Sequence, residues 1–357
     1  MSKKARLIAF YLPQYYPIPE NDKFWGKGFT EWTNVARARP LFPGHYQPHI
    51  PADLGFYDLR VPETRIAQAE MARDYGIEGF CYYHYWFAGK QILDKPLQEV
   101  IKTREPRFPF SLCWANENWT GIWSGNDKKI FLEQTYPGHN DEVEHFNILL
   151  NAFSDDRYIK VEGKPIFMVY QPDNLPNPKK WTDTWHELAI RAGLKGLFII
   201  AYSNHPWPFR EMGFDASTPK ILGKMRMYDP QWLRRIKIVI RTVLGYPPWI
   251  YSYEKIVKSP VSYFKEGVEH DVFPCILPNW DNSPRRKKRG VIIHNSTPEL
   301  FRIYFQSALQ QVFHKSPENK IIYIKSWNEW AEGNYLEPDL KFGKGYLDVI
   351  KSEILKI

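Results

Sequence analysis

The chain has 357 residues, of which 43% are hydrophobic and 25% are charged. This composition is close to that of ordinary globular proteins, so it excludes wholesale disorder and supplies enough apolar side chains for a full core. The formal net charge is +8, which would suit an anionic partner without identifying one. Aromatic residues make up 16% of the chain, more than a core alone requires.

The amino-terminal sequence MSKKARLIAFYLPQYYP is basic, but its apolar run ends at Pro13 and is shorter than a secretory signal requires. No run of about 18 apolar residues predicts a transmembrane helix. Cys81, Cys113 and Cys275 lie in apolar runs, and their odd number favours buried free thiols over disulfides. We therefore expect a cytoplasmic protein and keep open a peripheral position at the inner face of the membrane.

Eight short apolar runs, each ending at polar or aromatic residues, predict β-strands along the whole chain. They cover residues 6–16, 77–87, 108–119, 164–173, 196–204, 213–219, 272–284 and 321–330. Apolar residues at helical spacing predict helices between several of these runs, at residues 62–76, 179–193 and 297–313. Because strands alternate with helices without hairpin signals, the sequence predicts an α/β fold, a single (β/α)8 TIM barrel formed by residues 1–357.

Two segments exceed a minimal barrel. Residues 17–58 are predicted to form a long loop after the first strand, of the length that functional loops have. Residues 220–270 form a basic insertion before the seventh strand. Within it, residues 232–244 predict an amphipathic helix, which we interpret as packed on the barrel, with contact to an anionic membrane surface as the alternative.

A second basic segment, RRKKR at residues 285–289, is interpreted as a solvated loop. Contact with a phosphate or a lipid headgroup is the alternative.

The last predicted strand leads into SWNEWAEGNYLEPD, residues 326–339, where Glu329 and Glu332 stand three positions apart among aromatic residues. Polar residues at the carboxyl ends of barrel strands face the active site. Two carboxylates in unequal surroundings can divide acid and base catalysis, as glycoside cleavage requires. We therefore predict that Glu329 and Glu332 are catalytic.

Other aromatic and polar residues near the strand ends are predicted to bind a sugar substrate by stacking and hydrogen bonding. They are Glu31, Trp32, Tyr83, His84, Trp114, Asn116, Glu117, Trp119, Trp327, Asn328, Trp330 and Tyr335. A structural role is the alternative for His84, and helix capping is the alternative for Asn116 and Glu117. His45 and His49 lack a third ligand at a recognisable spacing, so we predict neither a metal nor a cofactor.

Five sequence blocks resemble a known family. They are FYLPQYYPIPENDKFWGKGFTEWTNVARARPLFPGHYQPHIPADLGFYDL, GFCYYHYWFAGK, CWANENWT, GKPIFMVYQP and SWNEWAEGNYLEPD. Together they are similar, over nearly the whole chain, to bacterial polysaccharide-biosynthesis glycosyltransferases that are related to glycoside hydrolase family 99. The resemblance implies a (β/α)8 barrel and, through the hydrolase relatives, retaining endo-α-mannosidase or endo-α-mannanase chemistry.

Those hydrolases carry an E-W-x-E motif after the last strand, which matches EWAE at residues 329–332. The resemblance thereby implies that Glu329 deprotonates the substrate 2-hydroxyl to give a 1,2-anhydro sugar, and that Glu332 is the general acid/base. Ala331 stands where the hydrolases often have His, and residues 17–58 differ from the corresponding loop. The identity of the substrate therefore does not carry over.

Two enzymatic functions follow. The first is a family 99-like retaining endo-glycosidase or transglycosidase that acts on α-mannoside-like glycans in surface polysaccharide (lipopolysaccharide) metabolism. The alternative is a glycosyltransferase that builds O-antigen or capsule from an activated sugar donor. A cytosolic location favours the alternative, whereas the sequence shows neither a D-x-D metal clamp nor a Rossmann-like phosphate site.

Other function classes are disfavoured. A non-catalytic carbohydrate-binding module would not need both carboxylates. Nucleic-acid binding is disfavoured because the basic residues are not interleaved with a recognised motif. The expected partner is an oligosaccharide or polysaccharide, for which we keep a lipid-linked form open, with residues 232–244 as a potential membrane contact.

Overall fold

The computed structural model describes residues 3–121, 126–203, 207–220, 248–258 and 271–355, together with residues 232, 235, 236 and 239. The main path of its central sheet contains eight strands, which neighbour one another in the order in which they occur along the chain. They are β1 (Arg6–Tyr11), β2 (Gly79–Phe87), β4 (Phe110–Trp114), β8 (Lys164–Val169), β9 (Phe198–Ser203), β10 (Ala216–Pro219), β12 (Cys275–Ile276) and β15 (Ile321–Ile324).

The sheet curves into a nearly closed barrel. Neighbouring strands pair in parallel, and β15 pairs with both β12 and β1. Between β10 and β12 the remaining contact is a parallel bridge from Ser217 to Val272. The predicted α/β barrel is thus confirmed, and each of the eight predicted strands overlaps an observed one.

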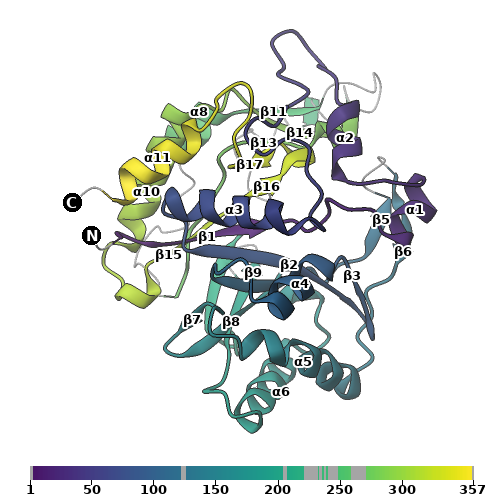
Figure 1. Ribbon diagram of the computed structural model, residues 1–357, viewed down its shortest axis with the longest axis vertical. Coiled ribbons are helices and arrows are strands. Elements are labelled where there is room, and N and C mark those ends of the chain that lie inside the picture. The colour runs from purple at the N-terminus through teal and green to yellow at the C-terminus, as the bar shows by residue number, and fades with distance from the viewer. Residues whose placement is uncertain are drawn as a thin grey trace.

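Helices cover the outside of the sheet (Figure 1). In chain order the longer ones are α3 (Pro62–Asp74), α4 (Lys95–Thr103), α5 (His139–Phe153), α6 (Pro178–Arg191), α10 (Pro298–Val312) and α11 (Gly345–Ile354). Because helices on one side and the barrel interior on the other exclude water, the strands are buried on both faces; all nine residues of β2 are buried. This explains why they are continuous apolar or aromatic runs in the sequence.

The loops contain more structure than the sequence predicted. Residues 17–58 include two short helices, α1 (Pro19–Trp25) and α2 (Glu31–Arg37), and α2 begins with a capping box formed by Thr30 and Thr33. The connection after β1 therefore contains two short helices that the sequence analysis did not predict. Small antiparallel pairings also occur next to the barrel strands, and the sequence analysis found no hairpin signals for them. They involve β3 (Lys90–Ile92), β5 (Trp119–Gly121), β6 (Asn126–Leu132), β7 (Lys160–Val161), β13 (Trp280–Asp281) and β14 (Val291–His294).

Most of the predicted insertion at residues 220–270 lies outside the described residues. Its described part includes β11 (Trp249–Ser252) and α8 (Tyr253–Lys258). Three apolar residues of the predicted helix at 232–244 are described, Trp232, Ile236 and Val239. All three are exposed, which does not fit the predicted packing of this helix on the barrel. Among the helices within the described ranges, none combines the length and apolarity that would be needed to cross a bilayer.

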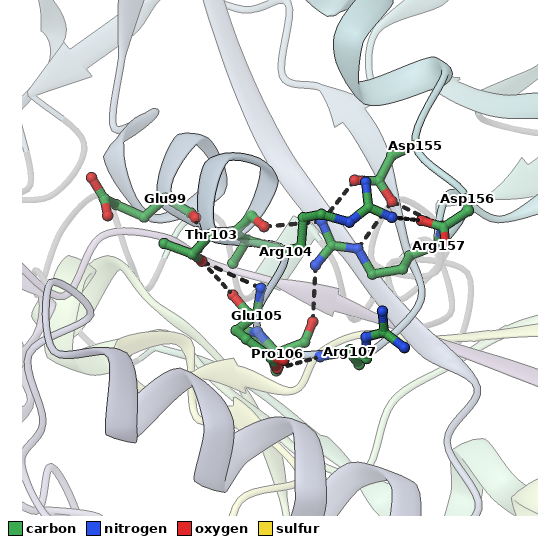
Figure 2. A network of polar contacts seen from close by, with 10 residues as sticks. Glu99, Thr103, Arg104, Glu105, Pro106, Arg107, Asp155, Asp156 and Arg157 are labelled. Atoms are coloured by element: carbon green, nitrogen blue, oxygen red, sulfur yellow. Dashed lines mark hydrogen bonds and ion pairs between the residues drawn. The ribbon is translucent and has the colours of Figure 1, made fainter.

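At the amino ends of the strands, a polar network joins the end of α4 to the turn after α5 (Figure 2). Arg157 donates to both carboxylate oxygens of Asp155, to the Pro106 carbonyl at 3.0 Å and to the Val100 carbonyl at 2.9 Å. Its own backbone carbonyl accepts from the first residue of β4, Phe110. In a barrel of this kind, contacts at the amino ends of strands serve stability, and the opposite end carries the site.

Candidate active site

The two carboxylates predicted to be catalytic lie on a short hairpin that follows β15. Strands β16 (Asn328–Glu329) and β17 (Asn334–Tyr335) pair antiparallel, and a 3-10 turn, η6 (Trp330–Glu332), joins them through Gly333. Gly333 has φ of 52°, and a Cβ there would meet the backbone nitrogen of Asp281 at 2.9 Å. Only glycine therefore fits this turn without strain.

The hairpin is anchored from behind by Glu337, a buried carboxyl group. Its Oε2 accepts from Trp330 Nε1 at 2.6 Å and from the Tyr57 hydroxyl at 2.9 Å, while its Oε1 accepts from Gln68 Nε2 at 2.6 Å. Burial raises the pKa of Glu337 to about 7 despite these donors. The Trp330 ring stacks on Tyr335 with 3.8 Å between centroids. These contacts fix the turn that carries Glu329 and Glu332.

Glu329 is held in its charged form. The Ser326 hydroxyl donates to its Oε2 at 2.6 Å, and Lys325 Nζ lies 3.2 Å from the same oxygen. Burial alone would raise the pKa of Glu329, but the charges of Lys325 and Arg285 outweigh burial and hold it below its ordinary value. A buried carboxylate of this kind is suited to accept a proton.

Glu332 is in a different environment. Its Oε1 lies 2.6 Å from Arg285 Nη1. Burial raises the pKa of Glu332 above its ordinary value; Arg285 opposes this effect, and the negative charge of Glu329 adds to it. The two environments thus shift the pKa values of the carboxyl groups in opposite directions, and Glu332 is the more readily protonated of the two. This is the arrangement by which two carboxyl groups take acid and base roles.

Arg285 links Glu332 to a third carboxyl group, Glu31. Its Nε and Nη2 lie 2.6 Å and 2.5 Å from Glu31 Oε1. Glu31 is fully buried, and burial raises its pKa to about 7 even beside this guanidinium. The interpretation of residues 285–289 as a solvated loop is therefore wrong for Arg285. It belongs to a short helix, α9 (Ser283–Arg286), which the 3-10 turn η4 (Lys287–Arg289) follows.

A cavity of about 400 Å³ opens over both carboxylates. Within the cavity lining, Lys325 Nζ donates to the Tyr83 hydroxyl at 2.8 Å. Tyr83, Tyr85 and Tyr170 supply its aromatic surface. The full lining is Leu12, Tyr83, Tyr85, Ala115, Glu117, Asn118, Trp119, Thr120, Tyr170, Asn174, Arg285, Lys325, Glu329 and Glu332. Aromatic faces beside charged and amide groups suit the binding of a sugar ring.

Some of the predicted binding residues line this cavity, and others do not. Tyr83, Glu117 and Trp119 line it together with the carboxylate pair. The residues that do not line it are Glu31, Trp32, His84, Trp114, Asn116, Trp327, Asn328, Trp330 and Tyr335. The structure thus does not place these nine residues at the surface of this cavity, and their contact with a substrate stays a prediction.

Two examples show how these residues act as supports. Asn328 donates to the Leu12 carbonyl and accepts from the Leu12 amide at 2.7 Å, which ties the hairpin to the end of β1. Asn116 makes the same kind of paired contact with the backbone of Gln171. Both residues position the wall of the cavity rather than line it.

His84 is buried against a second histidine, with 2.8 Å between its Nε2 and that of His145. Burial lowers the pKa of His84 to about 3 and that of His145 well below its usual range, so both rings are neutral. The structural alternative for His84 therefore fits the geometry better than a contact with substrate.

Arg285, Lys325 and Tyr170 are site residues that sequence reasoning missed. Lys325 and Tyr170 follow the last residues of their strands, so the rule that selected Glu329 could have found them. Arg285 sits in a run of charges that resembles an exposed loop, and no local signal distinguishes it.

His45 and His49 are occupied by separate partners. His45 Nε2 lies 2.6 Å from Asp281 Oδ2, and His49 Nδ1 lies 2.7 Å from the Tyr335 hydroxyl. Within the described ranges, no group of three or more His, Cys, Asp or Glu side chains has the geometry to hold a metal ion.

A family model described as glycosyltransferase WbsX matches residues 7–350. The chain belongs to the WbsX glycosyltransferase family. The protein WxcX of Xanthomonas campestris pv. campestris is 34% identical over 365 residues, which cover 99% of this chain and 50% of that protein. The chain thus spans about half the length of the curated relatives it matches. Membership of the WbsX family supports a carbohydrate-active enzyme, without fixing the reaction.

Two solved structures resemble the barrel. A glycoside hydrolase-like protein aligns with a TM-score of 0.61 at 16% identity and covers 100% of this chain and 95% of its own. The GH99 endo-alpha-mannosidase from Bacteroides thetaiotaomicron aligns with a TM-score of 0.56 at 13% identity, over 99% of this chain and 97% of its own. At these identities the likeness shows the fold, and this WbsX family member has the barrel that the sequence predicts.

Proposed function

We propose that this WbsX family member is a retaining endo-glycosidase or transglycosidase that acts on α-mannoside-like glycans of a surface polysaccharide. The observation that carries the proposal is the pair of carboxyl groups, Glu329 and Glu332, which share one cavity but have pKa values displaced in opposite directions. Glycoside cleavage needs a base and an acid at the same bond.

In the proposed first step, the Glu329 carboxylate accepts the proton of the substrate 2-hydroxyl. The freed oxygen attacks the anomeric carbon, the glycosidic bond breaks, and Glu332 donates its proton to the departing oxygen. The product is a 1,2-anhydro sugar. Lys325 keeps Glu329 ionised before this step, because its ammonium group lies 3.2 Å from the Glu329 carboxylate.

In the second step, water or a sugar hydroxyl attacks the anomeric carbon. Glu332 accepts the proton of the attacking group, and Glu329 returns a proton to the 2-oxygen as the three-membered ring opens. Two displacements at the same carbon give net retention. Water as the attacking group gives hydrolysis, whereas a sugar hydroxyl gives transglycosylation.

A glycosyltransferase that uses an activated sugar donor is the second candidate. The description of the family model favours it. In such an enzyme Glu329 or Glu332 would act as the base for an acceptor hydroxyl, and the donor would bring its own leaving group.

Mass spectrometry of reaction products tests the proposal. The purified protein is incubated with free and lipid-linked oligosaccharides of the source's own polysaccharide, with and without nucleotide sugars, beside the Glu332→Gln variant. Shortening or rearrangement of the glycan without a nucleotide sugar, lost in the variant, is the expected result. Growth of the acceptor only when a nucleotide sugar is supplied would contradict the glycosidase mechanism and support the second candidate.

A further inference from the structure

A second cavity, of about 630 Å³, lies beside the carboxylate site. Residues of the segment 25–41 line one side of it, and residues 283–289 line the other. Arg285 lines both this cavity and the carboxylate cavity. A ligand that extends past Arg285 would therefore contact both.

The lining of this second cavity is strongly basic. It contains Arg37 and Arg39 on one side and all five cations of residues 285–289 on the other, and none of its lining residues is an Asp or a Glu. Arg285 is already paired with Glu31 and Glu332, but the excess of positive charge in the lining creates a positive electrostatic potential that attracts anions. Arginine side chains in such clusters suit phosphate oxygens, which they can contact in a bidentate manner.

Uncharged donors in the same lining provide independent evidence. Asn34 Nδ2 and Ser283 Oγ are buried without a hydrogen-bond partner, in side chains that are only 7% and 5% exposed. The indole nitrogen of Trp25 is likewise buried and unpartnered. Buried polar atoms are usually paired, and an amide NH₂ and an indole N–H can only donate. These atoms can donate hydrogen bonds to a ligand that is rich in acceptor oxygens.

We propose that this cavity binds the diphosphate group of a diphosphate-linked glycan, whose sugar lies in the carboxylate cavity on the other side of Arg285. The inference rests on the proposed function, and it narrows the substrate to a glycan that carries a diphosphate ester. That ester can come from a nucleoside diphosphate or from a prenyl diphosphate. Trp25 and Phe29 line the cavity as well and offer an apolar surface to either group.

Calorimetric titration with inorganic pyrophosphate at low salt tests the site. The first variant combines Lys287→Gln, Lys288→Gln and Arg289→Gln, three exposed residues of the lining. The matched control combines Lys102→Gln, Arg107→Gln and Lys195→Gln, which are exposed and lie outside the lining. Both variants lose three positive charges, so a general effect of net charge cancels. We expect the first to weaken pyrophosphate binding by about tenfold or more, and the control by less than about twofold.

Ser283→Ala provides a second test at a single atom. Because the hydroxyl has no partner in the structure, its removal should leave the urea midpoint of unfolding unchanged while weakening pyrophosphate binding by about threefold to tenfold. Absence of pyrophosphate binding to the wild-type protein, or equal weakening in the two triple variants, would overturn the inference.

Two further titrations distinguish the sources of the ester. Tighter binding of uridine diphosphate than of geranyl diphosphate indicates a nucleotide donor, and the reverse order indicates a lipid-linked glycan; either order supports the diphosphate site. Binding is measured without turnover. Intact pyrophosphate binding without glycan cleavage would therefore overturn the proposed function alone, and glycan cleavage without pyrophosphate binding would overturn this inference alone.

Discussion

Glu337→Gln perturbs the anchor of the catalytic hairpin with almost no change of shape. The carboxyl group accepts three hydrogen bonds, from Trp330, Tyr57 and Gln68. A glutamine has one acceptor oxygen, so at least one of these donors would face an NH₂ group. Gln68 cannot turn over to compensate, because its own Oε1 accepts from the Tyr11 hydroxyl at 2.7 Å. The loss of one buried hydrogen bond costs about 1–3 kcal/mol.

The stability difference between the wild-type protein and the Glu337→Gln variant should also depend on pH. Burial raises the pKa of Glu337 from its ordinary value of 4.5 to about 7. The stability associated with the protonated group is fully present below pH 4.5 and is lost as the pH rises through about 7. A difference of about 2.5 between the two pKa values corresponds to about 3 kcal/mol. The variant has no such group, so the wild-type protein should lose stability relative to it, mainly between pH 5 and pH 8.

Urea unfolding followed by tryptophan fluorescence at pH 5, 6, 7 and 8 measures this difference. Glu31, whose pKa is also raised to about 7, is present in both proteins, so its contribution cancels in the comparison. We expect the variant to be less stable than the wild-type protein at pH 5. Between pH 5 and pH 8 the difference in unfolding free energy should shift by about 2–3 kcal/mol in favour of the variant. A difference in unfolding free energy that stays constant with pH would refute the raised pKa of Glu337.

Three further changes test other parts of the account. Lys325→Met removes the charge that keeps Glu329 ionised, so the pKa of Glu329 should rise and the acidic limb of the pH–kcat/KM profile should move to higher pH; an unmoved limb would count against the base role of Glu329. Gly333→Ala forces a Cβ into backbone at a positive φ, and we expect a loss of about 1–3 kcal/mol in urea unfolding, together with loss of activity; an unchanged midpoint would contradict the strain argument. Asp155→Asn weakens the paired contact with Arg157, which holds the pKa of Asp155 at about 2. Since a lowered pKa contributes stability that is present above pH 3.8 and lost as the pH falls toward 2, the variant should unfold more easily at pH 7 by about 1–3 kcal/mol, while kcat stays unchanged; equal stability at pH 7 would contradict this.

The barrel was predictable because each strand is buried on both faces and therefore stands out as an apolar run. The carboxylate pair was predictable for a related reason, since Glu329 and Glu332 directly follow such a run. Arg285 was not predictable, because its partner Glu31 lies 254 positions away and only the folded barrel brings the two together. The same holds for His84, whose environment is set by His145 on α5.

Tryptophans near the strand ends illustrate a further limit. Trp119 lines the cavity, whereas Trp327 and Trp330 pack behind it as parts of the core. All three follow strand-like runs, and a barrel exposes to its mouth only the side chains that point inward at the carboxyl end. Sequence position fixes which residues are near the rim, but it does not fix on which side of the wall each ring lies.

The distinct roles of Glu329 and Glu332 are the central claim, and fluoride release from a glycosyl fluoride tests them most directly. The substrate is the glycan that is cleaved in the product analysis, with fluoride in place of its leaving group. Fluoride departs without protonation, so Glu332→Gln should release it in the first turnover within about tenfold of the wild-type rate, whereas Glu329→Gln should be slower by about 100-fold or more. Fast release by Glu329→Gln, or equal losses in both variants, would contradict the assignment of base and acid.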